Sequence, residues 1–370
     1  GMGVSAGMAV LTATDIPHGP IEVLITATEE TGMDGANGLK PGVLKGDILL
    51  NLDSETEGEL YVGCAGGLDS TIEFNYKEAA VPADSKAFKL SLKGLKGGHS
   101  GMDINLGRGN SNKLLFRFLK ANAKALDLRM AAVNGGSLRN AIPRESFALV
   151  TVPSENAGQL QAKVAEASAI YKAELIEKDP DVKLLVEEAE LPARVMDADL
   201  QERLIDAIMG CPNGTVRMID SMPGTVETSN NLAIVKTTED KIVINTLMRS
   251  SVETAKDYLA DSLQAVFELA KADRIIFDGA YPGWKPNPHS AILKLMQEIY
   301  QKMYHKAPEI MAVHAGLECG ILGAKYPNWD MISFGPTICH PHSPDEKVNI
   351  ASVGKFWDYL KEVLKEVPVK

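Results

Sequence analysis

The sequence predicts an α/β fold: a discontinuous domain with a mainly parallel sheet flanked by helices, and an inserted α+β domain of the split βαβ type. Short, mostly apolar runs such as 331–334 occur towards both ends of the chain and are typical of strands buried on both faces. In the middle, 88–93 alternates apolar and polar residues, as a half-exposed strand does. We therefore expect one domain from 1–82 and 274–370, with 83–273 inserted.

Glycine and proline separate the expected elements of the discontinuous domain. The last helix has an amphipathic pattern around Phe356, Leu360 and Leu364. In chain order we expect a helix at 3–13, strands near 21–28, 47–53, 59–64 and 69–77, then a strand at 274–277, a helix at 290–305, strands at 309–314 and 331–334, and a helix at 352–367.

The inserted region predicts the order β-α-β-β-α-β, which defines the split βαβ arrangement. Its elements are expected at 88–93, 112–126, 129–134, 145–152, 156–178 and 182–188. A helix near 198–209, strands near 214–220 and 241–249, and a helix at 252–272 follow.

Composition excludes some classes of partner. The formal net charge is −11 and no dense basic patch is present, which argues against a nucleic-acid partner. No apolar run approaches the length of a membrane span, so we expect no membrane partner. The four cysteines are scattered, which favours reduced thiols and a cytoplasmic location.

Acidic residues follow two predicted strands. Glu29 and Glu30 follow the run 21–27 after the single residue Thr28, and Asp53 ends the next strand. Ligands bind at the carboxyl ends of strands in open α/β sheets, and adjacent carboxylates favour a bound cation, so this pattern indicates a metal site. Two ordinary interpretations remain: a solvated helix N-terminus for Glu29 and Glu30, and a turn-forming residue for Asp53.

Histidines add candidates for metal and substrate binding. His342 lies in a loop between a buried strand and the last helix, where an imidazole suits a zinc ligand, whereas His340 better fits a turn residue. His99 lies among glycines in the inserted region and could stabilise an oxyanion, or it could be incidental at a hairpin tip. His314 and Glu318 could shape a substrate pocket, although a structural, buried histidine is an equally good interpretation.

Two polar residues of the inserted region could bind substrate. Arg249 could hold a carboxylate through two parallel hydrogen bonds, and Asn140 could donate to a carbonyl or carboxylate. A surface arginine and a turn asparagine are the ordinary alternatives. The chain contains no P-loop and no nucleophile elbow, which argues against phosphate binding by a P-loop and against Ser-His-Asp catalysis.

Taken together, these segments resemble the aminoacyl-histidine (Xaa-His) dipeptidases, within the di-zinc aminoacylase and carboxypeptidase-like peptidases. The resemblance covers essentially the whole chain. Its motifs are Thr28–Gly32, Asn51–Glu55, Gly97–Gly101, Asn140–Pro143 and Pro341–Glu346, with Gly58–Gly67 and His314–Gly320 typical of that branch.

The resemblance implies a role for each candidate. Glu29 would be the general acid/base, Glu30 and His342 ligands of one zinc, and Asp53 a ligand of the other. His99, Asn140 and Arg249 would bind the scissile carbonyl and the substrate carboxylate. The substrate would be a dipeptide with C-terminal histidine, and the cofactor would be two divalent metal ions, expected to be zinc as in the family. A homodimer is possible, in which the partner could supply His99.

The family pattern also has a His-x-Asp strand and a bridging aspartate before the Glu-Glu pair, and neither is found upstream of Glu29. We therefore expect an N-terminally truncated catalytic domain that holds at most one metal ion, weakly, with severely reduced activity. Two alternatives to Xaa-His hydrolysis stay open: a non-catalytic remnant or partner-dependent binding domain, and a deacylase or carboxypeptidase.

Overall fold

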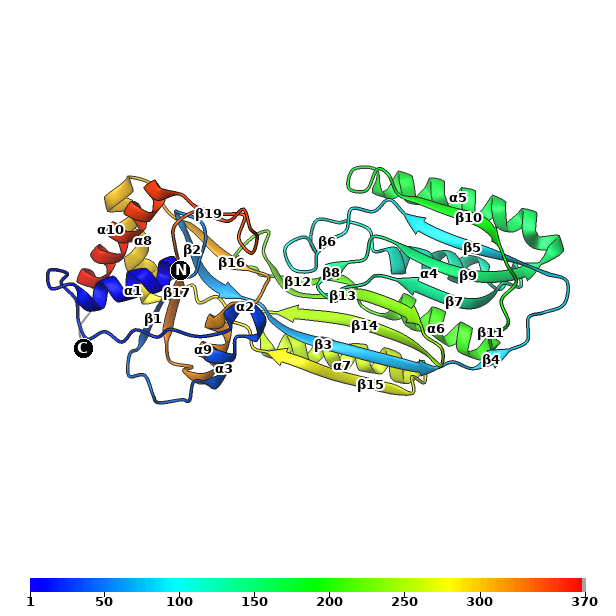
Figure 1. Ribbon diagram of the computed structural model, residues 1–370, viewed down its shortest axis with the longest axis horizontal. Coiled ribbons are helices and arrows are strands. Elements are labelled where there is room, and N and C mark those ends of the chain that lie inside the picture. The colour runs from blue at the N-terminus through cyan, green and yellow to red at the C-terminus, as the bar shows by residue number, and fades with distance from the viewer. Residues whose placement is uncertain (368–370) are drawn as a thin grey trace. The chain divides into compact units, whose positions relative to one another are not determined.

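The computed structural model describes residues 1–367, and the chain divides into two compact units. The first unit combines Gly1–Gly66 with the chain from Tyr281 onward, and the second is Gly67–Ala280. Both contain a sheet with helices packed against it, so the predicted α/β class is confirmed (Figure 1). The domain bounds expected from the sequence, 82/83 and 273/274, stay a prediction.

The first unit is built on a four-stranded sheet in the order β1-β17-β2-β16. Strands β1 and β17 pair in parallel, as do β2 and β16. An aromatic cluster covers the sheet, in which the Phe334 ring lies 5.5 Å from Phe356 and 5.6 Å from Tyr359. The elements of this unit are α1 (Met2–Thr12), α2 (Glu29–Gly32), α3 (Asp34–Gly38), β1 (Ile48–Asn51), β2 (Glu59–Cys64), α8 (Ala291–Tyr304), β16 (Glu309–Val313), α9 (Glu318–Lys325), β17 (Asp330–Ser333), β18 (Ile338–Cys339), β19 (Lys347–Val348) and α10 (Ile350–Glu366).

The prediction of a strand near 21–28 is wrong. This segment is irregular, and Ile25 is 56% exposed. Glu22, near the start of the run, accepts hydrogen bonds from the backbone N–H groups of Lys45 and Gly46 at 2.7 and 3.0 Å, so a side chain and not a strand ladder fixes the segment. Glu29 and Glu30 consequently begin the short helix α2.

The second unit contains a nine-stranded sheet. Strands β10, β5, β9 and β7 are neighbours in that order and pair antiparallel, which confirms the predicted split βαβ arrangement. The elements are β3 (Gly66–Asn75), β4 (Glu78–Ala79), β5 (Ser85–Lys93), β6 (Gly98–His99), α4 (Ser111–Asn122), β7 (Arg129–Gly135), β8 (Ala141–Ile142), β9 (Ser146–Pro153), α5 (Ala157–Leu175), β10 (Lys183–Ala189), β11 (Val195–Met196), α6 (Ala198–Gly210), β12 (Gly214–Met218), β13 (Val226–Thr237), β14 (Lys241–Ser250), α7 (Glu253–Leu269) and β15 (Arg274–Tyr281).

Strand β13, absent from the sequence-based expectation, lies inside this sheet between β7 and β14. Its residues Thr228–Asn231 are polar, yet all are buried. Helices α4, α5, α6 and α7 contribute to one large apolar core that includes Phe116 and Phe267. Buried polar side chains in such a strand need hydrogen-bond partners, and here backbone carbonyls outside the strand accept from Asn230 and Asn231.

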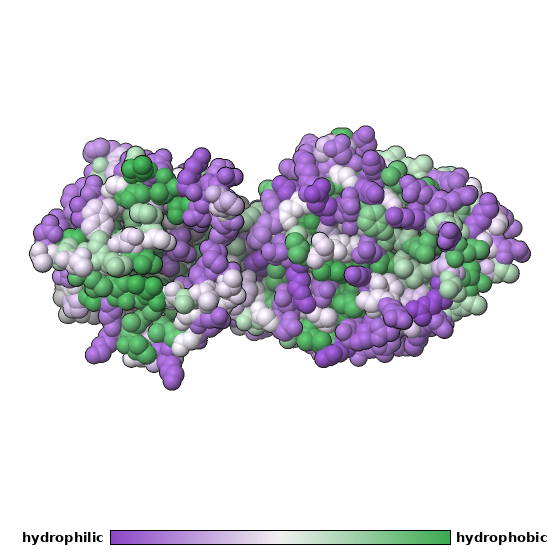
Figure 2. All heavy atoms as spheres, in the orientation of Figure 1, coloured by the Kyte–Doolittle hydropathy of each residue, from purple (hydrophilic) through white to green (hydrophobic). Residues whose placement is uncertain are grey.

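On the face shown in Figure 2, hydrophilic and hydrophobic residues are interspersed on both units. In the first unit, α1 leaves Met8 58% and Leu11 61% exposed. None of the helices described within residues 1–367 is both long enough and apolar enough to cross a membrane.

Candidate active site

Residues from opposite ends of the chain meet in the first unit. Thr28, with a φ of 56°, turns the chain into α2, so Glu29 and Glu30 stand at its start. His342 lies in the turn after β18. Its Nε2 atom is 3.1 Å from Oε2 of Glu30, and both side chains are largely exposed. Two of the predicted metal ligands are therefore in direct contact.

Further carboxylates share this neighbourhood. Partial burial raises the pKa of Glu29, and the nearby charges of Asp53, Glu30 and Glu318 raise it further, while His342 opposes them. The pKa of Asp53 is also raised, first by desolvation; the amino group of Gly1 opposes the shift and Glu30 adds to it. This mutual repulsion is what a cation or a shared proton would relieve.

The donor set partly fits a divalent cation. Imidazole nitrogen and carboxylate oxygen are zinc ligands, and bonds of about 2.0–2.1 Å in a tetrahedron put neighbouring ligand atoms about 3.3 Å apart. The contact between Glu30 and His342 is close to that spacing. Within residues 1–367, however, no three His, Cys, Asp or Glu side chains are arranged to hold one ion.

Glu318, at the start of α9, lies near Glu29 and Asp53, and His314 follows β16. His314 is buried, 6% exposed. The hydroxyl of Thr26 donates to Oε2 of Glu318 at 2.8 Å, whereas the buried Oε1 has no hydrogen-bond partner among the described residues. Burial raises the pKa of Glu318, the bond from Thr26 opposes that shift, and the charge of Asp53 adds to it.

The candidates of the inserted region meet in the second unit. Strands β6 and β8 pair, with His99 opposite Ala141. The Ser100 N–H donates to the carbonyl of Asn140 at 2.9 Å, and Nε of Arg249 donates to the Ser100 hydroxyl at 3.4 Å. The ladder therefore brings His99, Asn140 and Arg249 to one place.

The protonation of His99 is set by its own loop. The backbone N–H groups of Gly101 and Met102 donate to Nδ1 at 3.1 and 3.0 Å, which leaves the proton of a neutral ring on Nε2. Desolvation lowers the pKa of His99, the positive charge of Arg249 lowers it further, and Asp103 opposes them. His99 is thus suited to donate a hydrogen bond from Nε2 as a neutral imidazole.

Sequence reasoning missed two residues beside this group, Asn231 and Arg139. Asn231 donates to the carbonyls of Arg139 and Ala141. The guanidinium of Arg139 donates to the Thr71 hydroxyl at 2.8 Å. The polar run Ser229–Asn231 is the sequence feature that could have pointed to Asn231, because amide side chains buried in a strand must find hydrogen-bond partners.

Comparison with known proteins agrees with the earlier resemblance. The model of peptidase family M20/M25/M40 matches residues 1–366. The cytosol non-specific dipeptidase of Escherichia coli K12 is 47% identical over 370 residues, which span 100% of this chain and 76% of that protein. The crystal structure of aminoacylhistidine dipeptidase from Vibrio alginolyticus is 49% identical with a TM-score of 0.96, over 99% of this chain and 75% of that one.

These comparisons give no support to the expectations of truncation, impairment or a non-catalytic remnant. Family membership also accounts for the metal-ligand side chains in contact, since M20 peptidases depend on metal ions. The chain therefore belongs to peptidase family M20/M25/M40 and is, by family, a metal-dependent hydrolase of peptide bonds.

Proposed function

We propose that this chain is a dipeptidase that hydrolyses dipeptides with a C-terminal histidine. The observation that carries the proposal is the contact of 3.1 Å between Glu30 and His342, next to Glu29, in a chain of this family. Both similar proteins are dipeptidases by name, and one is named for aminoacylhistidine substrates.

Glu29 acts as the general acid/base in this proposal. It takes a proton from the attacking water and delivers it to the leaving amine of the substrate. Such a group works best when its pKa lies near the operating pH, and burial together with neighbouring carboxylates raises the pKa of Glu29 in that direction.

Glu30 and His342 would hold one divalent cation, which we propose to be zinc, and Asp53 would be a ligand of the other metal position. The chemistry that a cation supplies here when bound is Lewis acidity, which acidifies water and polarises a carbonyl. We propose weak binding of one ion, because three protein ligands are the usual minimum of a catalytic zinc site.

The remaining residues bind the substrate. His99 donates from Nε2 to the scissile carbonyl, while Asn140 and Arg249 bind the carbonyl and the terminal carboxylate. His314 helps to shape the pocket. The buried, unpaired Oε1 of Glu318 is suited to the protonated α-amine of a dipeptide.

Hydrolysis of Gly-His by the metal-stripped chain, with and without added Zn²⁺, tests this proposal. We expect histidine release that depends on zinc, and a loss of about 10²- to 10⁴-fold in Glu29→Gln, the usual range for a general acid/base. Glu57→Gln, a carboxylate of the same unit that pairs with Lys355, is the control and should leave the rate unchanged.

Zinc-dependent release of histidine that survives Glu29→Gln would refute the role of Glu29. The absence of hydrolysis at any zinc concentration would refute the function. His342→Ala should also lower zinc affinity, as measured by titration calorimetry, because it removes one of the two side chains in contact.

We further propose a cytosolic location, as the name of the Escherichia coli protein states for that protein. A homodimer is proposed as the assembly, and sedimentation velocity would decide it. In that case His99 could come from either subunit.

A further inference from the structure

Asn231 makes an unusual pair of contacts. It lies in β13 and is 1% exposed. Its Nδ2 group donates one hydrogen bond to the carbonyl of Arg139 at 3.0 Å and another to the carbonyl of Ala141 at 2.8 Å. These carbonyls stand on either side of Asn140, so a single amide fixes the backbone before and after that residue.

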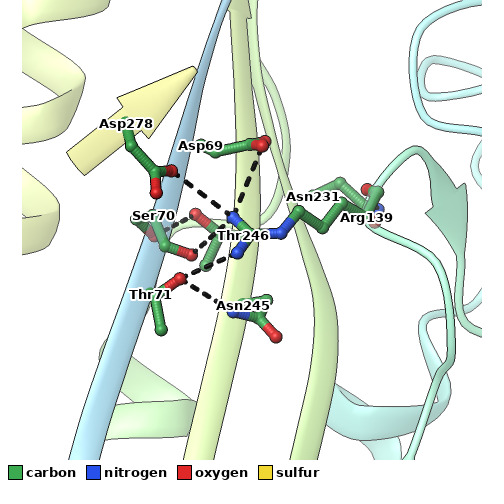
Figure 3. Close-up of polar contacts among 8 residues, drawn as sticks. All are labelled: Asp69, Ser70, Thr71, Arg139, Asn231, Asn245, Thr246 and Asp278. Carbon is green, nitrogen blue, oxygen red and sulfur yellow. Dashed lines mark hydrogen bonds and ion pairs between the residues drawn. The ribbon is translucent and has the colours of Figure 1, made fainter. Parts of the chain in front are cut away.

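Other contacts hold the same turn against the sheet. The guanidinium of Arg139 lies among side chains of β3, β14 and β15 (Figure 3). It donates to Thr71 Oγ1 at 2.8 Å and to the Ser70 carbonyl at 3.3 Å, and it lies 3.5 Å from Asp69.

The start of the turn, at Gly136, also packs closely against β13. Gly136 has a φ of +74°, and a Cβ atom there would come within 1.8 Å of the Ala233 carbonyl oxygen. This close approach leaves the turn no room to settle deeper onto the strand. Asn140 itself is exposed.

We propose that Asn231 is a positioning residue that sets the direction of the Asn140 side chain and, through the β6–β8 ladder, the place of His99. The inference rests on the proposed function, in which both residues bind the substrate. A misplacement of about 1 Å at such residues can cost about 10²-fold in rate.

The chain offers a matched control in the neighbouring residue. Asn230 is also buried, at 0% exposure, and its Nδ2 donates to the Pro212 carbonyl at 2.7 Å. The Oδ1 atoms of Asn230 and Asn231 both lack a hydrogen-bond partner among the described residues. Successive side chains of a strand point to opposite faces, so Asn230 does not reach the turn.

The experiment compares Asn231→Leu with Asn230→Leu. Both should lower the midpoint of thermal unfolding, since each removes a buried donor. We expect Asn231→Leu to lower kcat/KM for Gly-His about 10- to 100-fold, and Asn230→Leu to change it less than about 3-fold. Asn231→Ser, which is smaller and uncharged, replaces Asn231→Leu if that variant does not fold.

A double-mutant cycle identifies the route of action. If Asn231 acts through Asn140, then Asn231→Leu added to Asn140→Ala should cost less activity than Asn231→Leu costs alone. Fully additive losses, or an equal loss of activity in Asn230→Leu, would overturn the inference.

Hydrogen exchange separates this inference from the proposed function. Exchange of the backbone amides of Ser100 and Ala141 should accelerate in Asn231→Leu and not in Asn230→Leu, whether or not the chain hydrolyses dipeptides. Unchanged exchange would overturn the positioning role even in an active enzyme. If the wild-type chain cleaves no dipeptide while Asn231→Leu shows the accelerated exchange, the proposed function would be overturned and the positioning role kept.

Discussion

Replacing Asp179 by asparagine tests whether this carboxylate holds together the two ends of the segment 96–109, which carries His99. Asp179 is fully buried, and its two carboxylate oxygens accept the backbone N–H groups of Lys96 and Gly109, each at 2.7 Å. These donors stand on either side of the segment that carries His99. In Asp179→Asn, one oxygen keeps its bond, whereas the new NH₂ group faces the other backbone N–H.

The cost can be worked from these contacts. One buried N–H is left without an acceptor, which costs about 1–3 kcal/mol, and the remaining bond loses its ionised partner. We expect a loss of about 3 kcal/mol in the free energy of unfolding. In a unit of this size, each kcal/mol lost lowers the midpoint of unfolding by about 2–4 °C, so the midpoint should fall by about 6–12 °C.

Calorimetry of the metal-stripped protein measures this midpoint, and Asp181→Asn, at an exposed neighbour, is the control. Hydrogen exchange at Gly109 should accelerate in Asp179→Asn alone. A midpoint within about 1 °C of the wild type would show that the carboxylate does not hold the loop, and the reasoning would be refuted.

Three further predictions concern the second unit. The imidazole of His99 should titrate, as followed by NMR, with a pKa below the ordinary value of about 6.5. Because the folded state then binds fewer protons than the unfolded state, the stability that His99 contributes is complete above pH 6.5 and falls as the pH drops below that value. A titration midpoint at or above pH 6.5 would contradict this prediction. Gly136→Ala should destabilise the unit by about 2–4 kcal/mol in urea unfolding, because φ is positive and the new Cβ atom would clash with the carbonyl oxygen of Ala233. Gly158→Ala, on α5 with open space around it, is the control and should be neutral or stabilising. Equal effects of the two substitutions would argue against the clash. Lys113→Met should lower the free energy of unfolding by about 2–3 kcal/mol, because Nζ donates to three carbonyls at the end of α6, those of Ile208, Met209 and Cys211. Lys120→Met, on α4 like Lys113, removes only a surface ion pair with Asp206 and should cost less than about 1 kcal/mol.

Periodicity predicted most of the fold, and it failed where long-range contacts decide. The amphipathic pattern around Phe356 predicted α10, and the alternation at 88–93 predicted β5. Strand β13 escaped because Ser229, Asn230 and Asn231 are typical of a turn. Asn230 and Asn231 are stable inside a sheet because loop carbonyls from distant parts of the chain accept their amides.

The candidate site was reached partly through a wrong element. Glu30 was expected near His342 because each was thought to follow a strand, and the two side chains are in contact although no strand precedes Glu30 in the described structure. The pairing of His99 with Ala141 could not be predicted, since β6 and β8 have only two residues each. Such short ladders leave no periodic pattern in a sequence.

The division of the chain into two units has a spectroscopic consequence. All three tryptophans, Trp284, Trp329 and Trp357, belong to the first unit. Intrinsic indole emission therefore observes the half with Glu30 and His342, while the half with His99 is silent at those wavelengths. A single tryptophan placed by substitution in the second unit would give each half its own optical signal in one sample.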